Sequence, residues 1–309
     1  MWGEMELAYI GLESKDLAGL ANYLEQHIGL VPGQPTPQGR MSWRLDGKCH
    51  RLWAQAGARS DAICLGFEVA NGRAWTDALA RLQALGCAPI EASAAECQER
   101  RVQHMVHVSA PWGVRVELVR GLAEADTPFQ SPRYPGGFVT QGQGFGHAVF
   151  QLPHAQAYAA ARRFAIEGLG MALSDWLRLP TPGGDLQVSF LHCNPRHHTL
   201  ALACVPEGTP PPAAPVPTLH HINFEVASVS TVGQAYEHAL CARVPMANTL
   251  GQHANDEMVS FYTVSPDGWC VEIGATGRVV GPDWDDRREY DRISQWGHQP
   301  PDALRALLG

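Results

Sequence analysis

Histidine is unevenly distributed along the chain, and its densest groups include other side chains that could bind a metal or transfer a proton. Three such stretches lie in the second half: LHCNPRHHT (191–199), LHHINFEV (219–226) and GQHANDE (251–257). Imidazole is the commonest metal ligand among protein side chains, and its charge changes near neutral pH. We therefore expect the chemistry of this protein to lie in its second half.

The adjacent pair His220 and His221 lies in a segment typical of a strand, where neighbouring side chains point to opposite faces. His220 alternates with Ile222, Phe224 and Val226, which is the pattern of a face packed against helices. His221 instead shares its face with polar side chains. We predict that His221 points into an open cup, whereas His220 packs on the other side or supports its neighbour.

The same alternation of side chains predicts that two further residues point into the cup. In GHAVFQL (146–152), His147 points away from the apolar face formed by alternate residues, and in GWCVEIG (268–274) Glu272 does the same. Two imidazoles and one carboxylate that converge in a cup suit a divalent transition metal. Non-haem Fe(II) oxygenases use this ligand set and keep open positions on the metal. His147, His221 and Glu272 are thus the predicted metal ligands.

The structural unit that positions these residues recurs four times. Each quarter of the chain begins with a short apolar strand, continues with an amphipathic helix and ends with further strands. The four opening strands are LAYIGLE (7–13), AICLGFEV (62–69), GHAVFQL (146–152) and HHINFEV (220–226). Such a repeat indicates one supersecondary unit that buries its face against neighbouring copies. We predict an α+β fold of four βαβββ modules, paired into two domains that each curl a mixed sheet around a cup.

Proline-rich segments separate the parts of the chain. DTPFQSPRYPGG (126–137) divides it near the middle, and PEGTPPPAAPVPT (206–218) divides the second half. Both contain too much proline for a helix or a central strand. We predict an N-terminal domain over residues 1–135, without a complete metal site. A catalytic C-terminal domain with a tail is predicted over residues 136–309.

Alignment of the modules supports this asymmetry. The phrase FEV recurs at 67–69 and 224–226 and sets the register between the two halves. This register places Cys64 opposite His221. The first strand of each half places Tyr9 opposite His147, and the closing phrases PWGVRVELVRG (111–121) and PDGWCVEIGATG (266–277) place Glu117 opposite Glu272. The first half thus keeps one carboxylate but lacks both imidazoles.

The composition is that of an ordinary globular chain. Of 309 residues, 45% are hydrophobic and 17% are charged, and the formal net charge is -8. An acidic chain without a dense Lys/Arg block argues against nucleic-acid binding, and no stretch approaches the roughly 20 apolar residues of a membrane span. The N-terminus lacks the features of a signal peptide, and the eight cysteines form no CxxC pair. We expect a cytoplasmic enzyme with reduced thiols.

Four stretches of the second half together resemble a known family. They are FLHCNPRHHTLALA (190–203), GFGHAVF (144–150), LHHINFEV (219–226) and HANDEMVSFYTVSPDGWCVE (253–272). These stretches are similar to the type I extradiol ring-cleavage dioxygenases, two-domain members of the vicinal oxygen chelate superfamily. The likeness spans nearly the whole chain and includes the 2,3-dihydroxybiphenyl and 1,2-dihydroxynaphthalene dioxygenases. It implies the three metal ligands already named, with Fe(II) as the metal and Mn(II) as the alternative.

The resemblance also implies a reaction and further site residues. The reaction is extradiol cleavage of a substituted or fused-ring catechol by O2, which gives a ring-opened semialdehyde acid. His198 would be the acid–base residue, His253 and Tyr262 would hydrogen-bond the substrate or dioxygen, and Asp256 would orient His253. By residue type alone, His198 could instead be a polar surface histidine, and Tyr262 a half-buried strand tyrosine.

The cup also suits two other functions. A glyoxalase-like isomerase or transferase would keep the metal and change the reaction, and a ligand-binding protein of the bleomycin-resistance kind would need no metal. The resemblance further implies a homo-oligomer, with a small aromatic catechol and O2 as its other partners. Four positions are candidates for shaping substrate choice: Phe145, Val149, Phe190 and Asn255.

Overall fold

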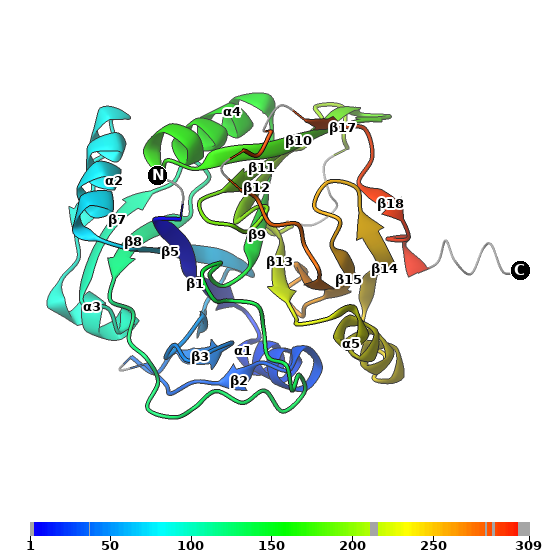
Figure 1. Cartoon of the computed structure of the whole chain (residues 1–309), viewed down its shortest axis with the longest axis horizontal. Coiled ribbons are helices and arrows are strands. Elements are labelled where there is room, and N and C mark those ends of the chain that lie inside the picture. Colours follow the sequence, from blue (N-terminus) through cyan, green and yellow to red (C-terminus); the bar gives the residue numbers. More distant parts are fainter. Residues whose placement is uncertain (1–2, 37, 211–215, 282, 286–287, 302–309) are drawn as a thin grey trace, which may run out of the picture.

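Two curled sheets form the fold, and each is built from two copies of the predicted module (Figure 1). The computed structural model describes residues 3–36, 38–210, 216–281, 283–285 and 288–301. The strand orders are β2-β3-β4-β1-β5-β8-β7-β6 in the first sheet and β17-β10-β11-β12-β9-β13-β16-β15-β14-β18 in the second. The opening strands of paired modules run antiparallel at the centre, β1 beside β5 and β9 beside β13. The predicted fold class is confirmed.

The first sheet contains the first two modules. Module one consists of β1 (Met5–Ser14), α1 (Leu17–Asn22), the π-helix η1 (Tyr23–Ile28), β2 (Val31–Pro32), β3 (Met41–Arg44) and β4 (Leu52–Ala56). Module two consists of β5 (Asp61–Val69), α2 (Gly72–Ala84), β6 (Ile90–Glu91), α3 (Ala94–Arg100), β7 (His104–Ser109) and β8 (Arg115–Arg120). Helix α3 is an addition to the predicted module. Ser93 and Glu96 form a capping box at its start, so this helix begins where local hydrogen bonds fix it.

The second sheet contains the other two modules and the tail. Module three consists of β9 (His147–Leu152), α4 (Ala155–Arg163), η2 (Phe164–Gly168), β10 (Ala172–Thr181), β11 (Gly184–His192) and β12 (Leu200–Cys204). Module four consists of β13 (Leu219–Glu225), α5 (Val229–Cys241), β14 (Met246–His253), β15 (Val259–Val264) and β16 (Cys270–Ala275). From the tail, β17 (Glu289–Tyr290) and β18 (Ser294–Trp296) extend the two edges of this sheet.

A helix leaves the end of each opening strand because a polar side chain caps its first turn. Asn71, His154 and Ser228 accept hydrogen bonds from backbone N–H groups three residues further on, at the starts of α2, α4 and α5. Such caps satisfy N–H groups that have no partner inside the helix. The change from strand to helix is therefore determined locally in each module.

The helices of the two halves pack against each other and join the sheets into one apolar core. Helix α2 contacts η2, and η1 contacts α5. Tyr23 of η1 also reaches β15, where its hydroxyl lies 2.6 Å from that of Thr263. The apolar faces predicted for β9, β13 and β16 belong to this core. Because these faces are covered, the opposite faces of the same strands remain for the site.

Strand pairing confirms the predicted alignment of the modules. Tyr9 pairs with Gly66, and Gly66 pairs with Glu117, in the first sheet. The second sheet repeats this register: His147 pairs with Asn223, and Asn223 pairs with Glu272. Residues equivalent in sequence therefore occupy equivalent places in the two sheets.

The strands of the first sheet end at Arg120 and those of the second begin at His147. The predicted domain boundary between residues 135 and 136 falls within this connection and stays a prediction. Of the proline-rich segment 206–218, residues 211–215 lie outside the described part of the chain. Among the described residues, no helix combines the length and apolar character needed to cross a membrane.

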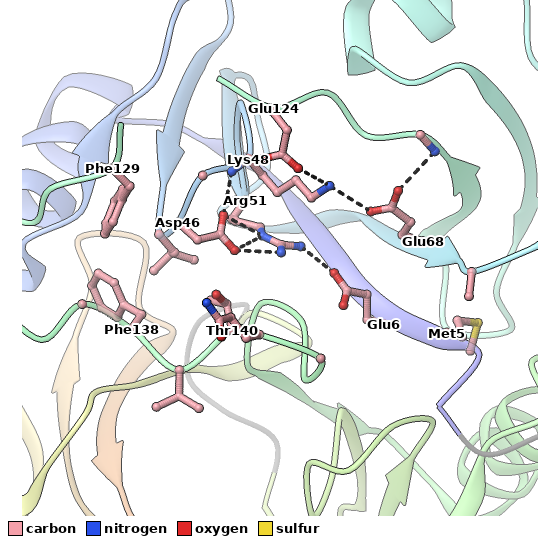
Figure 2. A pocket seen from close by; sticks show the side chains of 18 of the residues that line it. Met5, Glu6, Asp46, Lys48, Arg51, Glu68, Glu124, Phe129, Phe138 and Thr140 are labelled. Atoms are coloured by element: carbon pink, nitrogen blue, oxygen red, sulfur yellow. Dashed lines mark hydrogen bonds and ion pairs between the residues drawn. The ribbon is translucent and has the colours of Figure 1, made fainter. Parts of the chain in front are cut away.

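A cleft of about 1530 Å³ lies beside the connection between the sheets (Figure 2). Several of its charged side chains pair with one another. Arg51 lies 2.8 Å from Asp46 and 3.1 Å from Glu6, and Lys48 lies 2.8 Å from Glu124. The predicted metal ligands do not line this cleft, so the chemistry predicted from the sequence lies elsewhere.

Candidate metal centre

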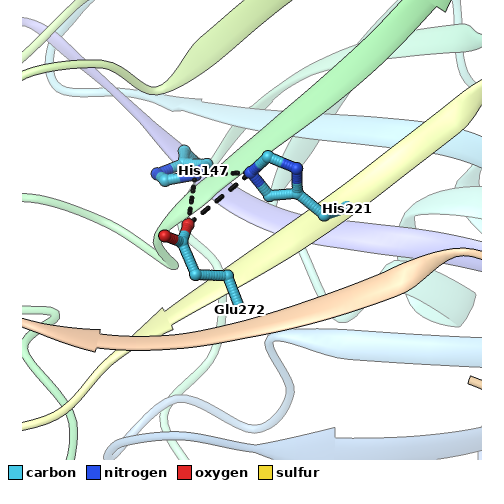
Figure 3. Close-up of side chains that lie close together, drawn as sticks. All are labelled: His147, His221 and Glu272. Carbon is cyan, nitrogen blue, oxygen red and sulfur yellow. Dashed lines mark hydrogen bonds and ion pairs between the residues drawn. The ribbon is translucent and has the colours of Figure 1, made fainter. Parts of the chain in front are cut away.

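The three predicted metal ligands meet at the centre of the second sheet (Figure 3). His147 comes from β9, His221 from β13 and Glu272 from β16. The Nε2 atoms of the two histidines lie 3.1 Å apart, and Glu272 Oε2 lies 3.1 Å from His147 Nε2 and 3.6 Å from His221 Nε2. All three side chains are buried. The structure therefore brings together three donor atoms from three neighbouring strands.

Strand register places these atoms on one face. His147, Asn223 and Glu272 are direct partners across three strands, and His221 precedes Asn223 by two residues. The backbone before His147 requires a glycine. Gly146 has a φ of +145°, and a Cβ atom there would lie 2.2 Å from the Asn223 carbonyl oxygen. This close approach sets where β9 begins and so where His147 lies.

The donor set fits a divalent metal ion. Ligand atoms about 2.1 Å from a metal, in perpendicular directions, are about 3.0 Å apart. The observed separations of 3.1, 3.1 and 3.6 Å are close to this value. Two imidazoles and a carboxylate on one side would also leave positions on a bound ion open, as in the facial triads of non-haem iron enzymes.

The carboxylate of Glu272 is oriented by its neighbours. Its Oε1 accepts hydrogen bonds from Ser260 Oγ at 2.6 Å and Tyr262 OH at 2.7 Å, and His253 Nε2 lies 3.2 Å away. Its Oε2 accepts a hydrogen bond from Asn223 Nδ2 at 3.1 Å and faces the two proposed histidine ligands. One oxygen is thus saturated by the protein, and the other is directed to the metal position.

The ionisation states suit metal binding. Burial lowers the pKa of His221 well below its usual value, and the adjacent His220 lowers it further. Burial alone would raise the pKa of Glu272, but hydrogen bonds from His147 and His253 hold it well below its usual value. A neutral imidazole and an ionised carboxylate are the forms that bind a metal.

The prediction that His220 lies on the packed side is wrong. A register shift between Leu219 and His221 makes His220 the extra residue of a bulge, and its side chain is exposed. The bulge interrupts the alternation on which the prediction depended. The Nδ1 atoms of His220 and His221 lie 2.7 Å apart, so His220 can accept the Nδ1–H of its neighbour and leave His221 Nε2 unprotonated.

His253 and Tyr262 lie together on the far side of Glu272. His253 Nε2 is 2.6 Å from Tyr262 OH. Burial would lower the pKa of His253, but the hydrogen bond to Glu272 and the charge of that carboxylate raise it to about 9. Burial, followed by the charge of Glu272, raises the pKa of Tyr262 well above its usual value. Both side chains are therefore proton donors at neutral pH.

His198 is buried beside the metal ligands, so the alternative of a surface histidine is wrong. It lies in the turn between β11 and β12, and its ring centroid is 3.9 Å from that of His147. The ring of Phe190 packs edge-on against it at 5.0 Å. Burial, and then the neighbouring His147, lower the pKa of His198 well below its usual value.

Asp256 has different contacts from those expected. Its Oδ1 accepts the backbone N–H of Met258 at 3.0 Å, and its Oδ2 lies 3.9 Å from His198 Nδ1. The ring of His253 is instead held by the backbone carbonyl of Ile293, 3.2 Å from its Nδ1. The expectation that Asp256 orients His253 is therefore not supported, because a tail residue occupies that place.

Comparisons with known proteins give the family. The model of the Glyoxalase/Bleomycin resistance protein/Dioxygenase superfamily matches residues 131–273, which include all three predicted metal ligands. A biphenyl-2,3-diol 1,2-dioxygenase of Metapseudomonas furukawaii is 35% identical over 97% of this chain and 96% of its own length. This chain belongs to the extradiol dioxygenases of the vicinal oxygen chelate superfamily.

Two further relatives agree with this assignment. An iron-dependent extradiol dioxygenase of Rhodococcus jostii (strain RHA1) is 33% identical over 94% of this chain and 96% of its own. The crystal structure of a halotolerant catechol dioxygenase superposes with a TM-score of 0.84 and 31% identity, over 96% of this chain and 95% of that one. The superfamily model covers glyoxalases, bleomycin-resistance proteins and dioxygenases alike. The relatives that match over nearly the full chain are named as dioxygenases.

Several contacts of this extradiol dioxygenase were not predicted from the sequence. Asn223 shares the face of His221, and Ser260 shares that of Tyr262, so strand alternation could have identified both. No sequence signal indicated His298. Its ring stacks on that of His253 at 4.3 Å, and its Nε2 lies 3.2 Å from Ser260 Oγ.

The four positions considered for substrate choice separate into two groups. Val149 pairs with Ala201, and Ala201 pairs with Phe190, so these three form a row on the face that carries the metal ligands. Phe145 packs instead in the main core, against Phe224, with ring centroids 5.3 Å apart. Asn255 donates a hydrogen bond to a buried aspartate. Val149 and Phe190 remain the candidates beside the site.

Proposed function

We propose that this dioxygenase uses Fe(II) to open the ring of a catechol that carries an apolar 3-substituent or a fused second ring. The observation that carries the proposal is the convergence of His147, His221 and Glu272 on one buried point. Bound Fe(II) would supply the redox chemistry through which O2 reacts with a catechol, and its charge would lower the pKa of the catechol hydroxyls. The relative named as iron-dependent supports iron over manganese.

An apolar surface beside the metal ligands supports the substrate class. Val149, Leu177, Val188 and Ala201 form a buried cluster, and Phe190 packs against it. This cluster is separate from the main core of the protein. Such a surface favours a ligand whose second ring or alkyl group leaves water. The relatives named as dioxygenases of biphenyl-2,3-diol fit this substrate class.

Three side chains would handle protons and hydrogen bonds. His198, on the His147 side, would accept a catechol proton and later return one to the breaking O–O bond. Tyr262 and His253 would donate hydrogen bonds to negative charge that develops on substrate or dioxygen oxygens. Both donors contact Oε1 of Glu272, the carboxylate proposed to bind the metal. Asp256 would act through His198, from which its carboxylate lies 3.9 Å.

Anaerobic reconstitution with Fe(II) tests the proposal. The loaded protein is supplied with O2 and with catechol, 3-methylcatechol, 2,3-dihydroxybiphenyl or 1,2-dihydroxynaphthalene, while O2 uptake and the yellow ring-opened product are measured. We expect uptake of one O2 per product and the highest kcat/KM with the larger substrates. Reconstitution with Mn(II) in parallel tests the metal. Turnover without metal, or turnover that survives His221→Ala, would contradict the proposal. The predicted homo-oligomer is tested separately, by sedimentation of the same protein.

A further inference from the structure

A chain of buried hydrogen-bonding groups extends from His198 away from the metal ligands. His198 Nδ1 lies 3.1 Å from Nδ1 of His197, and His197 Nε2 lies 2.9 Å from Asp175 Oδ2. Asn255 Nδ2 donates to the other oxygen of Asp175 at 3.2 Å. All four side chains are buried, with Asp175 at 0% exposure. Water therefore does not compete for these contacts.

The chemistry of the groups sets the direction of each hydrogen bond. An ionised carboxylate only accepts, so the proton shared with Asp175 lies on His197 Nε2. When the ring of His197 carries only this proton, its Nδ1 accepts. The donor to it is therefore His198 Nδ1–H, and a neutral His198 is left with an unprotonated Nε2.

A second contact favours the same arrangement. The carboxylate of Asp256 lies 3.9 Å from His198 Nδ1, which is too far for a direct hydrogen bond but close enough to favour a proton on that atom. Asp256 is itself fixed through its other oxygen by the backbone N–H of Met258. Two separate segments, the turn between β11 and β12 that holds His197 and the loop after β14 that holds Asp256, thus direct acceptors at one nitrogen of His198.

The ring of His197 is held in place from other directions as well. Ser174 Oγ donates to the backbone carbonyl of His197, and Trp284 packs edge-on against the imidazole with ring centroids 5.3 Å apart. Trp284 is itself anchored, because its indole N–H donates to the carbonyl of Ser174 at 2.6 Å. His197 therefore has little freedom to rotate away from His198.

We propose that Asp175 and His197 are positioning residues that hold His198 as its Nδ1–H tautomer, with the Nε2 lone pair available for a substrate proton. The inference rests on the proton-transfer role proposed above for His198. In that step the lone pair of Nε2 forms an N–H bond, the catechol O–H bond breaks, and its electron pair stays on the catechol oxygen. The resulting imidazolium keeps its Nδ1–H directed at His197, now as a stronger, charge-assisted hydrogen bond.

The tautomer is measured by 15N NMR on the full-length protein labelled at histidine and loaded with diamagnetic Zn(II). The His198 signals are identified by their absence from the spectrum of His198→Gln. We expect a protonated Nδ1 and an unprotonated Nε2 in the wild type. In His197→Phe, which removes the acceptor, a fraction of His198 should carry its proton on Nε2. Wild-type His198 with its proton on Nε2 would overturn the inference.

Kinetics of the iron-loaded variants separate positioning from a purely structural role. We expect His197→Phe to lower kcat by about 10–100-fold, as for other residues that orient a functional group, with KM and iron content unchanged. His197→Asn keeps an acceptor oxygen close to the place of Nδ1 and should recover most of this loss, while Asp175→Asn should fall between the two. Equal losses in His197→Asn and His197→Phe would overturn the inference.

The two proposals fail in different ways. Wild-type protein that shows the Nδ1–H tautomer but opens no catechol ring would overturn the proposed function and leave the positions of Asp175 and His197 explained. Wild-type protein that opens catechol rings while His198 carries its proton on Nε2 would overturn this inference alone.

Discussion

Glu117 and Glu272 occupy equivalent places in the two sheets. The carboxylate of Glu117 is held by a tyrosine and two arginines, whereas that of Glu272 faces two imidazoles. In the first sheet, Tyr9 OH donates to Glu117 Oε2 at 2.6 Å, and Arg100 Nε donates to the same oxygen at 3.0 Å. Arg115 Nε lies 2.8 Å from Oε1. Burial alone would raise the pKa of Glu117, but Arg100 and the hydrogen bond from Tyr9 hold it below its usual value.

The residues between the carboxylate and its partners account for the difference. Gly66 leaves space for the ring of Tyr9, which lies 2.3 Å from where a Cβ atom of residue 66 would be. The equivalent residue in the second sheet is Asn223, which fixes one oxygen of Glu272. The fold thus supplies a buried carboxylate in each half. Neighbouring side chains decide whether a protein cation neutralises it or whether one of its oxygens faces two imidazoles.

Replacement of Glu272 or Glu117 by glutamine should give the largest difference between the two sheets in metal content and turnover. We expect Glu272→Gln to lose its metal and more than about 100-fold of its turnover, which exceeds the effect usual for residues that only support a ligand. Glu117→Gln should keep both in the protein that remains folded. Metal analysis and O2 uptake on the purified variants check this. A comparable loss of metal in Glu117→Gln would show that the two sites are not independent.

The adjacent histidines test the role of the bulge. His221→Ala should lose metal, because it removes a donor atom. His220→Ala should bind iron with an affinity reduced by at most about 10–100-fold, because it removes only the acceptor for His221 Nδ1–H. Fe(II) titration under anaerobic conditions gives both affinities. Equal loss in the two variants would mean that His220 takes part in binding the metal directly.

The free energy of unfolding should show the opposite order, with the larger loss in Glu117→Gln rather than in Glu272→Gln. Glu117→Gln leaves the buried guanidinium of Arg100 without its counter-charge, and removal of one partner from a buried ion pair costs about 3–5 kcal/mol. Because Gln keeps one acceptor, we expect a value near the lower end, measured by urea unfolding. The control Glu167→Gln breaks the exposed pair with Arg163 and should change the free energy of unfolding by less than about 1 kcal/mol.

A smaller effect of pH is expected from His50, which lies under Tyr9 in the first sheet with ring centroids 5.2 Å apart. Burial, and then the charge of Arg100, lower its pKa to about 3. The unfolded chain takes up a proton near pH 6.5, so the stability from neutral His50 is complete above that pH and is lost as pH falls toward 3. Unfolding of His50→Leu between pH 6.5 and 4.5 should depend less steeply on pH, by up to about 1.4 kcal/mol per unit. An unchanged slope would show that His50 is not buried neutral.

Strand alternation is a local property, and it was sufficient to predict that the side chains of the three proposed metal ligands share one face of the sheet. His147, His221 and Glu272 each oppose an apolar face that the core requires, so a wrong orientation would have buried a polar row. The internal repeat then distinguished the two halves, because equivalent positions carry different side chains. Both arguments compare residues within a few positions of one another or at a fixed period.

Contacts made across the fold could not be predicted in this way. The bulge at His220 depends on how β13 pairs with β9, which no pattern within one strand encodes. The partner of His253 comes from the tail at Ile293, and Arg100 reaches Glu117 from a helix that the repeat did not contain.

The sequence by itself determined which residues face the cup, because alternation and repetition are short-range. Only the tertiary structure decided which hydrogen bonds orient those residues. Asp175 and His197 belong to separate segments, and they meet only because β10 packs beside the turn after β11. Long-range packing brings such groups together after local preferences have fixed the strands.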